Sequence, residues 1–151
     1  MLDRGSLLLA CALHRGRFGE EEVFAEKIRA AYQRLSSRDL YDLYLFANTA
    51  YDRDAVKALV VIKCWNAREP FDPNRLLNKI TGEEYDWSDL RRLVRPDQLP
   101  TEKEIIETVT SNYAYLKELD RKLKLLRADS KTHRRRGLAD SLIRDLRSRK
   151  R

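Results

Sequence analysis

The stretch EEEVFAEKIRAAYQRLSSRDLYDLYLFAN, residues 20–48, decides the fold because it encodes two helices joined by a two-serine turn. Ser36 and Ser37 end a first helix over Glu20–Leu35, and Ser37 can cap a second helix over Arg38–Asn48. The second helix is apolar nearly all round, which is typical of a helix at the centre of a fold. The apolar stripe of the first helix is Val23, Phe24, Ile28, Ala31 and Leu35.

Helix signals continue along the rest of the chain, and few stretches alternate apolar and polar residues as strands do. Asp72 followed by Pro73 marks a helix start, and Thr101 and Glu104 have capping-box spacing. A mainly α fold is therefore expected. Its further helices are residues 54–66, residues 73–82, one or two turns from Asp86, a longest helix over residues 102–126 and an amphipathic final segment from Gly137.

The net charge of +7 is concentrated at the C-terminal end. Residues 131–151 hold nine Lys or Arg and two Asp, whereas the other 22 basic residues are matched by 22 acidic ones. A neutral body with a basic tail favours contact with nucleic acid. A solvated terminus is the alternative interpretation of the same pattern.

Neither a disulfide scaffold nor a zinc site is indicated by the two cysteines, Cys11 and Cys64, which have no CxxC partner. Cys64 lies in the apolar segment VVIKCW and is expected to be a small buried side chain. The apolar run Ser6–Leu13 is much shorter than the roughly 20 residues that cross a membrane. A cytoplasmic protein without a membrane partner is therefore expected.

Two charged side chains interrupt the apolar faces of the helix pair. Lys27 falls inside the stripe of the first helix, so it must extend to solvent, pair with a carboxylate or face a cleft. Asp42 lies between Tyr41 and Leu43 on the nearly apolar second helix. The simple alternative is a salt bridge between Arg38 and Asp42, four residues apart at a helix start.

A tight turn between two antiparallel helices would bring Lys27 and Asp42 to one cleft. Such a pair suits phosphoryl or nucleotidyl transfer. The lysine can neutralise charge on phosphate oxygens, and the aspartate can orient an attacking hydroxyl or accept its proton.

The segment EKIRAAYQRLSSRDLYDLYLF resembles the last two conserved motifs of the AbiEii/AbiGii toxin family of bacterial nucleotidyltransferases. The family's Kxx(A) motif corresponds to KIRA, residues 27–30, and its RDxxDL motif to RDLYDL, residues 38–43. The segments PFDPNRLLNKI and YDWSDLRRLV also resemble the family's C-terminal region, so the resemblance covers residues 20–126.

The resemblance implies the helical C-terminal region of a polymerase-β-like nucleotidyltransferase. It implies that Lys27 contacts the nucleotide, that Asp42 is the catalytic carboxylate, and that Arg38 and Asp39 support the site. A nucleoside triphosphate and Mg²⁺ are the implied cofactors. RNA, in particular tRNA, is the implied substrate, in a toxin–antitoxin or abortive-infection system with a cognate antitoxin protein as partner.

The family's first two motifs, a GS turn after a strand and a D-x-D pair that would hold Mg²⁺, are not matched in the same way. Gly5-Ser6 is present, but no D-x-D follows before Lys27, and Asp52-Arg53-Asp54 is interpreted as a helix cap. Most of the N-terminal sheet is thus expected to be missing, and the chain is expected to be a truncated or split product that is inactive alone. The alternatives are a true start that lies upstream and another polypeptide that completes the site. The expected parts are residues 1–19 as a remnant of the N-terminal region, 20–128 as a helical domain and 129–151 as a basic tail.

Two other functions are consistent with the sequence. The first is a nucleic-acid-binding helical module, in which Trp65, Trp87 and Tyr115 either stack on bases or belong to the core. The second is a protein-interaction domain that uses an apolar face left open by the missing sheet. The basic residues expected to contact nucleic acid are Arg134, Arg135, Arg136, Arg149, Lys150 and Arg151.

Overall fold

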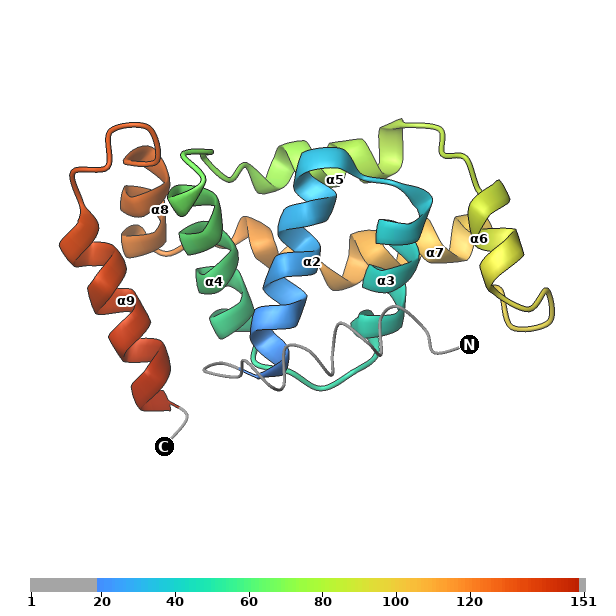
Figure 1. The fold of residues 1–151 in the computed structure, drawn as a ribbon, viewed down its shortest axis with the longest axis horizontal. Coiled ribbons are helices and arrows are strands. Elements are labelled where there is room, and N and C mark those ends of the chain that lie inside the picture. Colours follow the sequence, from blue (N-terminus) through green and yellow to red (C-terminus); the bar gives the residue numbers. More distant parts are fainter. Residues whose placement is uncertain (1–18, 150–151) are drawn as a thin grey trace. The chain divides into compact units, whose positions relative to one another are not determined.

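The computed structural model describes residues 19–149, which contain helices and no strand (Figure 1). The mainly α fold class expected from the sequence is confirmed for this part of the chain. The elements are α2 (Glu20–Arg34), α3 (Ser37–Ala47), α4 (Arg53–Asn66), α5 (Pro73–Gly82), α6 (Ser88–Leu93), α7 (Glu102–Asn112), the 3-10 helix η1 (Ala114–Lys117), α8 (Arg121–Ala128) and α9 (Arg136–Arg149).

Side-chain caps set the starts of several helices, as the sequence predicts. Asp52 accepts the backbone N–H of Ala55 at 3.1 Å and opens α4, which confirms that Asp52-Arg53-Asp54 is a cap. Asp72 opens α5 with Pro73 in its first turn, and Thr101 opens α7. Each oxygen satisfies a backbone N–H that has no partner within its helix.

The cap of α3 is Ser36, and the prediction of Ser37 is wrong. Ser36 accepts the backbone N–H of Asp39. The hydroxyl of Ser37 instead donates to the backbone carbonyl of Asp86 at 2.7 Å, and Ser37 is buried. A contact between segments 49 residues apart therefore decided which serine caps the helix.

The single helix predicted over residues 102–126 is also wrong, because the structure divides this segment into α7, η1 and α8. The side chain of Asn112 donates to the carbonyl of Thr108 at 2.9 Å at the end of α7. Asp120 accepts the backbone N–H of Leu123 at 2.9 Å and starts α8. Both residues offer the backbone a local alternative to a continuous helix.

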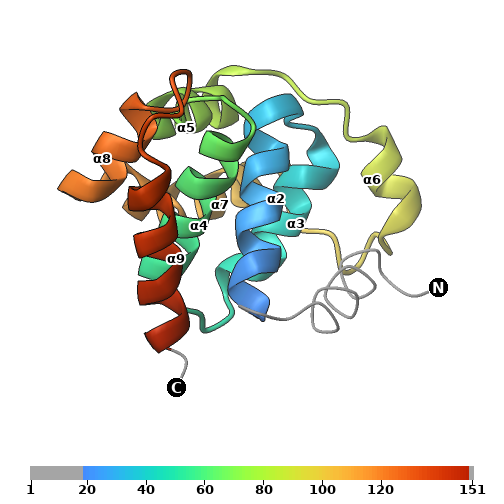
Figure 2. The same ribbon diagram turned by 60° about the vertical axis from the view of Figure 1, so that its left-hand side comes forward.

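The chain forms two compact units, each built from separate segments. The first unit contains the described part of residues 1–29 together with residues 51–71 and 118–149, and the second contains residues 30–50 and 72–117. In the first unit α4 packs against α8 and α9 (Figure 2). In the second, α3 and α5 pack against α7, and α6 packs against α3.

Each unit has its own apolar core. Cys64 of the first unit is fully buried, as predicted, and burial raises the pKa of its thiol to about 12, so the thiolate is scarce at neutral pH. Trp65 and Trp87 are also buried, which confirms the core interpretation for both indoles, and Tyr115 is half-buried. The core includes Val56, Val60, Leu123 and Leu126 in the first unit and Leu40, Leu43, Leu76, Ile105 and Tyr113 in the second.

The three-part division predicted from the sequence stays a prediction. The expected N-terminal remnant lies outside the described residues except for Gly19, as do Gly5-Ser6 and Cys11. The final segment forms the expected amphipathic helix, α9, which buries Ala139, Leu142 and Leu146. Among the described helices, none combines the length and the apolar character that crossing a membrane requires.

Candidate functional site

The turn between α2 and α3 is held by a reciprocal capping box. The backbone N–H and the hydroxyl of Ser36 both donate to Oδ2 of Asp39 at 2.9 Å, and the backbone N–H of Asp39 donates back to the Ser36 hydroxyl at 3.3 Å. Asp39 is only 4% exposed. Arg34 approaches the same oxygen at 3.5 Å, but its exposed side chain adds little. Asp39 therefore fixes the start of the helix that carries Asp42.

The backbone of this turn is strained at Leu35, whose φ of 32° lies in the left-handed region. This conformation costs a non-glycine residue about 1–2 kcal/mol. The side chain of Leu35 is buried, and burying a leucine contributes about 1.5–3 kcal/mol. Packing of Leu35 thus offsets the strain and orients the entry into α3.

Arg38 forms an ion pair with Asp89 of α6, and the pairing with Asp42 considered from the sequence is not found within residues 19–149. The guanidinium Nη2 of Arg38 lies 3.7 Å from Oδ2 of Asp89. The Nε of Arg38 is buried without a hydrogen-bond partner. Arg38 therefore connects the motif helix to α6, and its predicted supporting role in the site stays a prediction.

Lys27 and Asp42 are both half-buried, Lys27 on α2 in the first unit and Asp42 on α3 in the second. Each has an interaction of its own. Because the two residues belong to different units, their convergence on one cleft stays a prediction, and so do their catalytic roles.

The basic residues predicted to contact nucleic acid divide into two groups. Arg134, Arg135 and Arg136 are exposed at the start of α9. Arg149, at the end of α9, lies 4.0 Å from Asp52 and 3.9 Å from Asp54 at the acidic start of α4, so part of its charge is matched within the chain. Lys150 and Arg151 lie outside the described residues.

Sequence reasoning missed a polar cluster around Asp129, which is 5% exposed. The carboxylate accepts the indole N–H of Trp65 at 3.0 Å, the hydroxyl of Thr132 at 2.7 Å and the backbone N–H groups of Arg134 and Arg135, both at 2.9 Å. Burial alone would raise the pKa of Asp129, but these hydrogen bonds hold it below its ordinary value. Asp129 is therefore a charged anchor that fixes the turn before α9.

His133 extends this cluster onto α4. Its ring stacks on the indole of Trp65, with centroids 4.0 Å apart and planes 4° from parallel. Its Nε2 lies 2.5 Å from the carbonyl oxygen of Trp65. Since a carbonyl can only accept, Nε2 carries the proton in this contact. A histidine and an aspartate in a basic segment carried no sequence signal for a partner 64 or 68 residues away.

The described residues do not assign a ligand set to Mg²⁺. Within residues 19–149, no three His, Cys, Asp or Glu side chains are grouped so that they could hold a metal ion. A divalent cation of this kind takes several carboxylate or carbonyl oxygens. The four motif residues are therefore interpreted without a bound metal. Lys27 supplies a cation and Asp42 a carboxylate. Arg38 forms an ion pair with Asp89, and Asp39 caps a helix.

The chain is similar to known proteins over most of its described length. The sequence profile of the family "Nucleotidyl transferase AbiEii toxin, Type IV TA system" matches residues 20–144. MenT4, a nucleotidyltransferase toxin from Mycobacterium tuberculosis H37Rv, has a similar structure, with a TM-score of 0.62 and 25% sequence identity over 84% of this chain. The match covers 44% of the MenT4 chain, so this chain spans less than half of that length. No curated protein shows significant sequence similarity.

The family profile includes both helices of the candidate site and the elements of both units. The structural similarity to a nucleotidyltransferase toxin agrees with the resemblance that RDLYDL carries. The chain belongs to the AbiEii family of nucleotidyl transferase toxins of type IV toxin–antitoxin systems.

Proposed function

We propose that this protein transfers nucleotides from a nucleoside triphosphate to RNA, with tRNA as the acceptor, and that the chain supplies the nucleotide-contacting helices of the site. The observation that carries the proposal is the family match, which spans KIRA on α2 and RDLYDL on α3. The proposed place of action is the cytoplasm, where tRNA is found, in a toxin–antitoxin or abortive-infection system with a cognate antitoxin.

The proposed roles follow from the chemistry of the four residues. Lys27 neutralises charge on phosphate oxygens of the triphosphate. Asp42 orients the attacking hydroxyl of the RNA or accepts its proton. Asp39 supports the site through the capping box with Ser36, and Arg38 supports it through the ion pair with Asp89 of α6. When bound, Mg²⁺ supplies charge neutralisation on the triphosphate, and we propose that its carboxylate ligands lie outside residues 19–149.

We predict that Lys27→Ala weakens binding of a nucleoside triphosphate by about tenfold or more, because a charge-assisted contact to phosphate is worth about 1.5–3 kcal/mol. The measurement is a titration of the full chain with a fluorescent ATP analogue in the presence of Mg²⁺. Lys103→Ala removes the same charge from an exposed position on α7 and is the matched control, expected to bind as the parent does.

A second arm of the same experiment measures transfer of labelled nucleotide to tRNA. Lys27-dependent binding without transfer by this chain supports the proposal that the chain carries the nucleotide side of the site. Transfer that is lost in Lys27→Ala and Asp42→Asn supports the function and overturns the expectation of inactivity alone. Equal triphosphate binding by the parent chain, Lys27→Ala and Lys103→Ala would refute the proposed role of Lys27.

RNA binding through the basic start of α9 gives a separate prediction. Replacing Arg134, Arg135 and Arg136 by alanine should reduce the slope of log K against log salt concentration by about 2, since each lost contact to a single-stranded phosphate contributes about 0.7. Replacing Arg91, Arg92 and Arg95, three exposed arginines of the second unit, removes the same charge. A similar loss of slope in both triple variants would mean that RNA contact is not specific to α9.

A further inference from the structure

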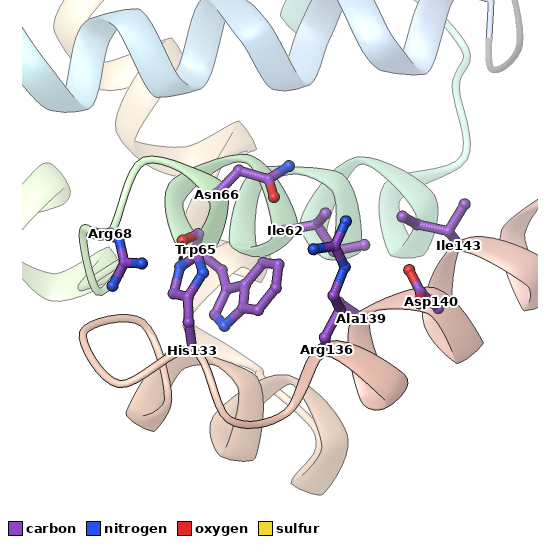
Figure 3. Close-up of a pocket in the computed structure, with 9 residues that line it drawn as sticks. All are labelled: Ile62, Trp65, Asn66, Arg68, His133, Arg136, Ala139, Asp140 and Ile143. Carbon is purple, nitrogen blue, oxygen red and sulfur yellow. Dashed lines mark hydrogen bonds between the residues drawn. The ribbon is translucent and has the colours of Figure 1, made fainter.

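A pocket of about 560 Å³ opens between α4 and the start of α9, within the first unit (Figure 3). Its volume falls in the range of about 300–1,000 Å³ typical of small-molecule sites. Ile62 and Ile143 contribute apolar surface, and Arg68, His133, Arg136 and Asp140 contribute polar groups. An apolar wall with a few polar groups at its edge is the usual composition of a ligand site.

Among the described residues, the charged groups that line this pocket form no ion pairs with one another. Arg136 points from the start of α9 toward Ile62 (Figure 3). Asp140 is four residues further along α9, but within residues 19–149 no ion pair joins it to Arg136. Arg68 donates to the carbonyl of Lys131 at 3.3 Å, which leaves its other N–H groups as further donors. Two guanidinium groups and one carboxylate therefore line the pocket, with a surplus of positive charge.

The position of the pocket at the start of α9 adds to this surplus. The first turn of α9 contains no acidic residue, although the N-terminus of a helix favours negative charge. Three consecutive arginines, residues 134–136, occupy this position. The Asp129 carboxylate is buried beneath the turn and accepts hydrogen bonds from the backbone N–H groups of Arg134 and Arg135. Asp129 therefore already supplies negative charge at the start of α9, and an anion in the pocket would balance the guanidinium groups.

The pocket wall is held in a strained arrangement. Arg68 and His133 have φ values of 58° and 52°, in a region that costs non-glycine residues about 1–2 kcal/mol each. Both residues contact the backbone carbonyl of Trp65. This carbonyl accepts the backbone N–H of Arg68 at 3.0 Å and lies 2.5 Å from Nε2 of His133. Strain maintained by surrounding contacts is frequent at binding sites. The arrangement presents Arg68 and His133 to the pocket before any ligand arrives.

We propose that this pocket binds the phosphate group of a nucleotide. Arg136 donates to the phosphate, the sugar or base lies on Ile62 and Ile143, and Asp140 accepts from a hydroxyl or amino group of the nucleotide. Arg68 lies on the other side of Trp65 and His133 (Figure 3) and adds positive charge at that end of the pocket. This inference rests on the proposed function for its ligand class and places a nucleotide contact on elements other than α2 and α3. A phosphate of an RNA strand and that of a free nucleoside triphosphate share this chemistry.

The test is a pair of anisotropy titrations of the full chain, one with a fluorescent single-stranded RNA and one with a fluorescent ATP analogue. Arg136→Ala should weaken binding of at least one of these probes by about tenfold or more. Arg144→Ala removes the same charge from an exposed position of α9 that does not line the pocket, and it should change affinity by less than about twofold. Ile143→Trp fills the apolar wall without changing charge and should weaken the same probe.

The two probes distinguish the two sources of phosphate. Selective loss of RNA binding assigns the pocket to a strand phosphate, and selective loss of ATP binding assigns it to a mononucleotide. The proposed phosphate site would be refuted if Arg136→Ala and Arg144→Ala had equal effects on binding and Ile143→Trp left binding unchanged. That outcome would leave the proposed function standing. The proposed function is tested separately through Lys27→Ala, on a helix that contributes nothing to this pocket.

Discussion

Replacing Trp65 with alanine should lower the free energy of unfolding by about 3–5 kcal/mol, the usual cost of truncating a buried aromatic side chain. Trp65 is 5% exposed, it stacks on His133, and its indole N–H donates to Asp129 at 3.0 Å. Its removal leaves a cavity under the start of α9 and takes one of two hydrogen-bond donors from Oδ2 of Asp129. Urea denaturation followed by circular dichroism measures the loss.

Trp65→Phe separates packing from hydrogen bonding at this position. The phenyl ring keeps most of the apolar contact and the stacking with His133, but it cannot donate to Asp129. We expect a cost of about 1.5–3 kcal/mol, that of losing one hydrogen bond to a charged group, since Oδ2 of Asp129 keeps the backbone N–H of Arg135. If Trp65→Ala and Trp65→Phe lost the same stability, the packing argument would be wrong. A loss under about 1 kcal/mol for Trp65→Ala would contradict the central place given to this residue.

Tyr113 has the corresponding position in the second unit. Its side chain is 1% exposed, and its hydroxyl donates to the backbone carbonyl of Leu43 on α3 at 2.9 Å. Tyr113→Ala should cost about 3–5 kcal/mol of unfolding free energy, because it empties the site where the end of α7 meets α3. The same urea denaturation experiment measures it.

Tyr113→Phe is the control, because it removes one hydroxyl and keeps the ring. Loss of a single hydrogen bond costs about 0.5–1.5 kcal/mol, and the variant should keep the remaining stability. A larger loss for Tyr113→Phe than for Tyr113→Ala would show that the hydroxyl, and not the packing of the ring, dominates at this position. Since Leu43 closes the RDLYDL motif, this pair also tests how firmly the motif helix is held.

Helix positions were predictable from the sequence wherever the signal was local. Asp52, Asp72 and Thr101 each cap a helix through a backbone N–H two or three residues away. Such contacts depend on neighbours in the chain, so the residue type and its spacing are sufficient to predict them. The break between α7 and α8 was missed because apolar spacing continues through it, while Asn112 bonds to the backbone at the end of α7 and Asp120 starts α8.

The candidate site was predictable in its residue types, and its long-range contact was decided by packing. The motif residues Arg38 and Asp39 were identified from RDLYDL. The capping box of Asp39 joins residues three positions apart, whereas the pairing of Arg38 with Asp89 depended on where α6 lies relative to α3. An ion pair between residues 51 positions apart has no spacing rule in the sequence.

The opening stretch, residues 20–48, by itself determined two helices, their serine turn and the resemblance to the nucleotidyltransferase family, because helical periodicity and motif spacing are properties of adjacent residues. The tertiary structure alone decided which serine caps α3, that Asp129 is a buried anchor for Trp65, and that Arg68 and Arg136 line one pocket. The two hydrogen bonds among these join residues 49 and 64 positions apart. Their physical cause is the burial of polar groups, each of which must find a hydrogen-bond partner wherever the packed chain provides one.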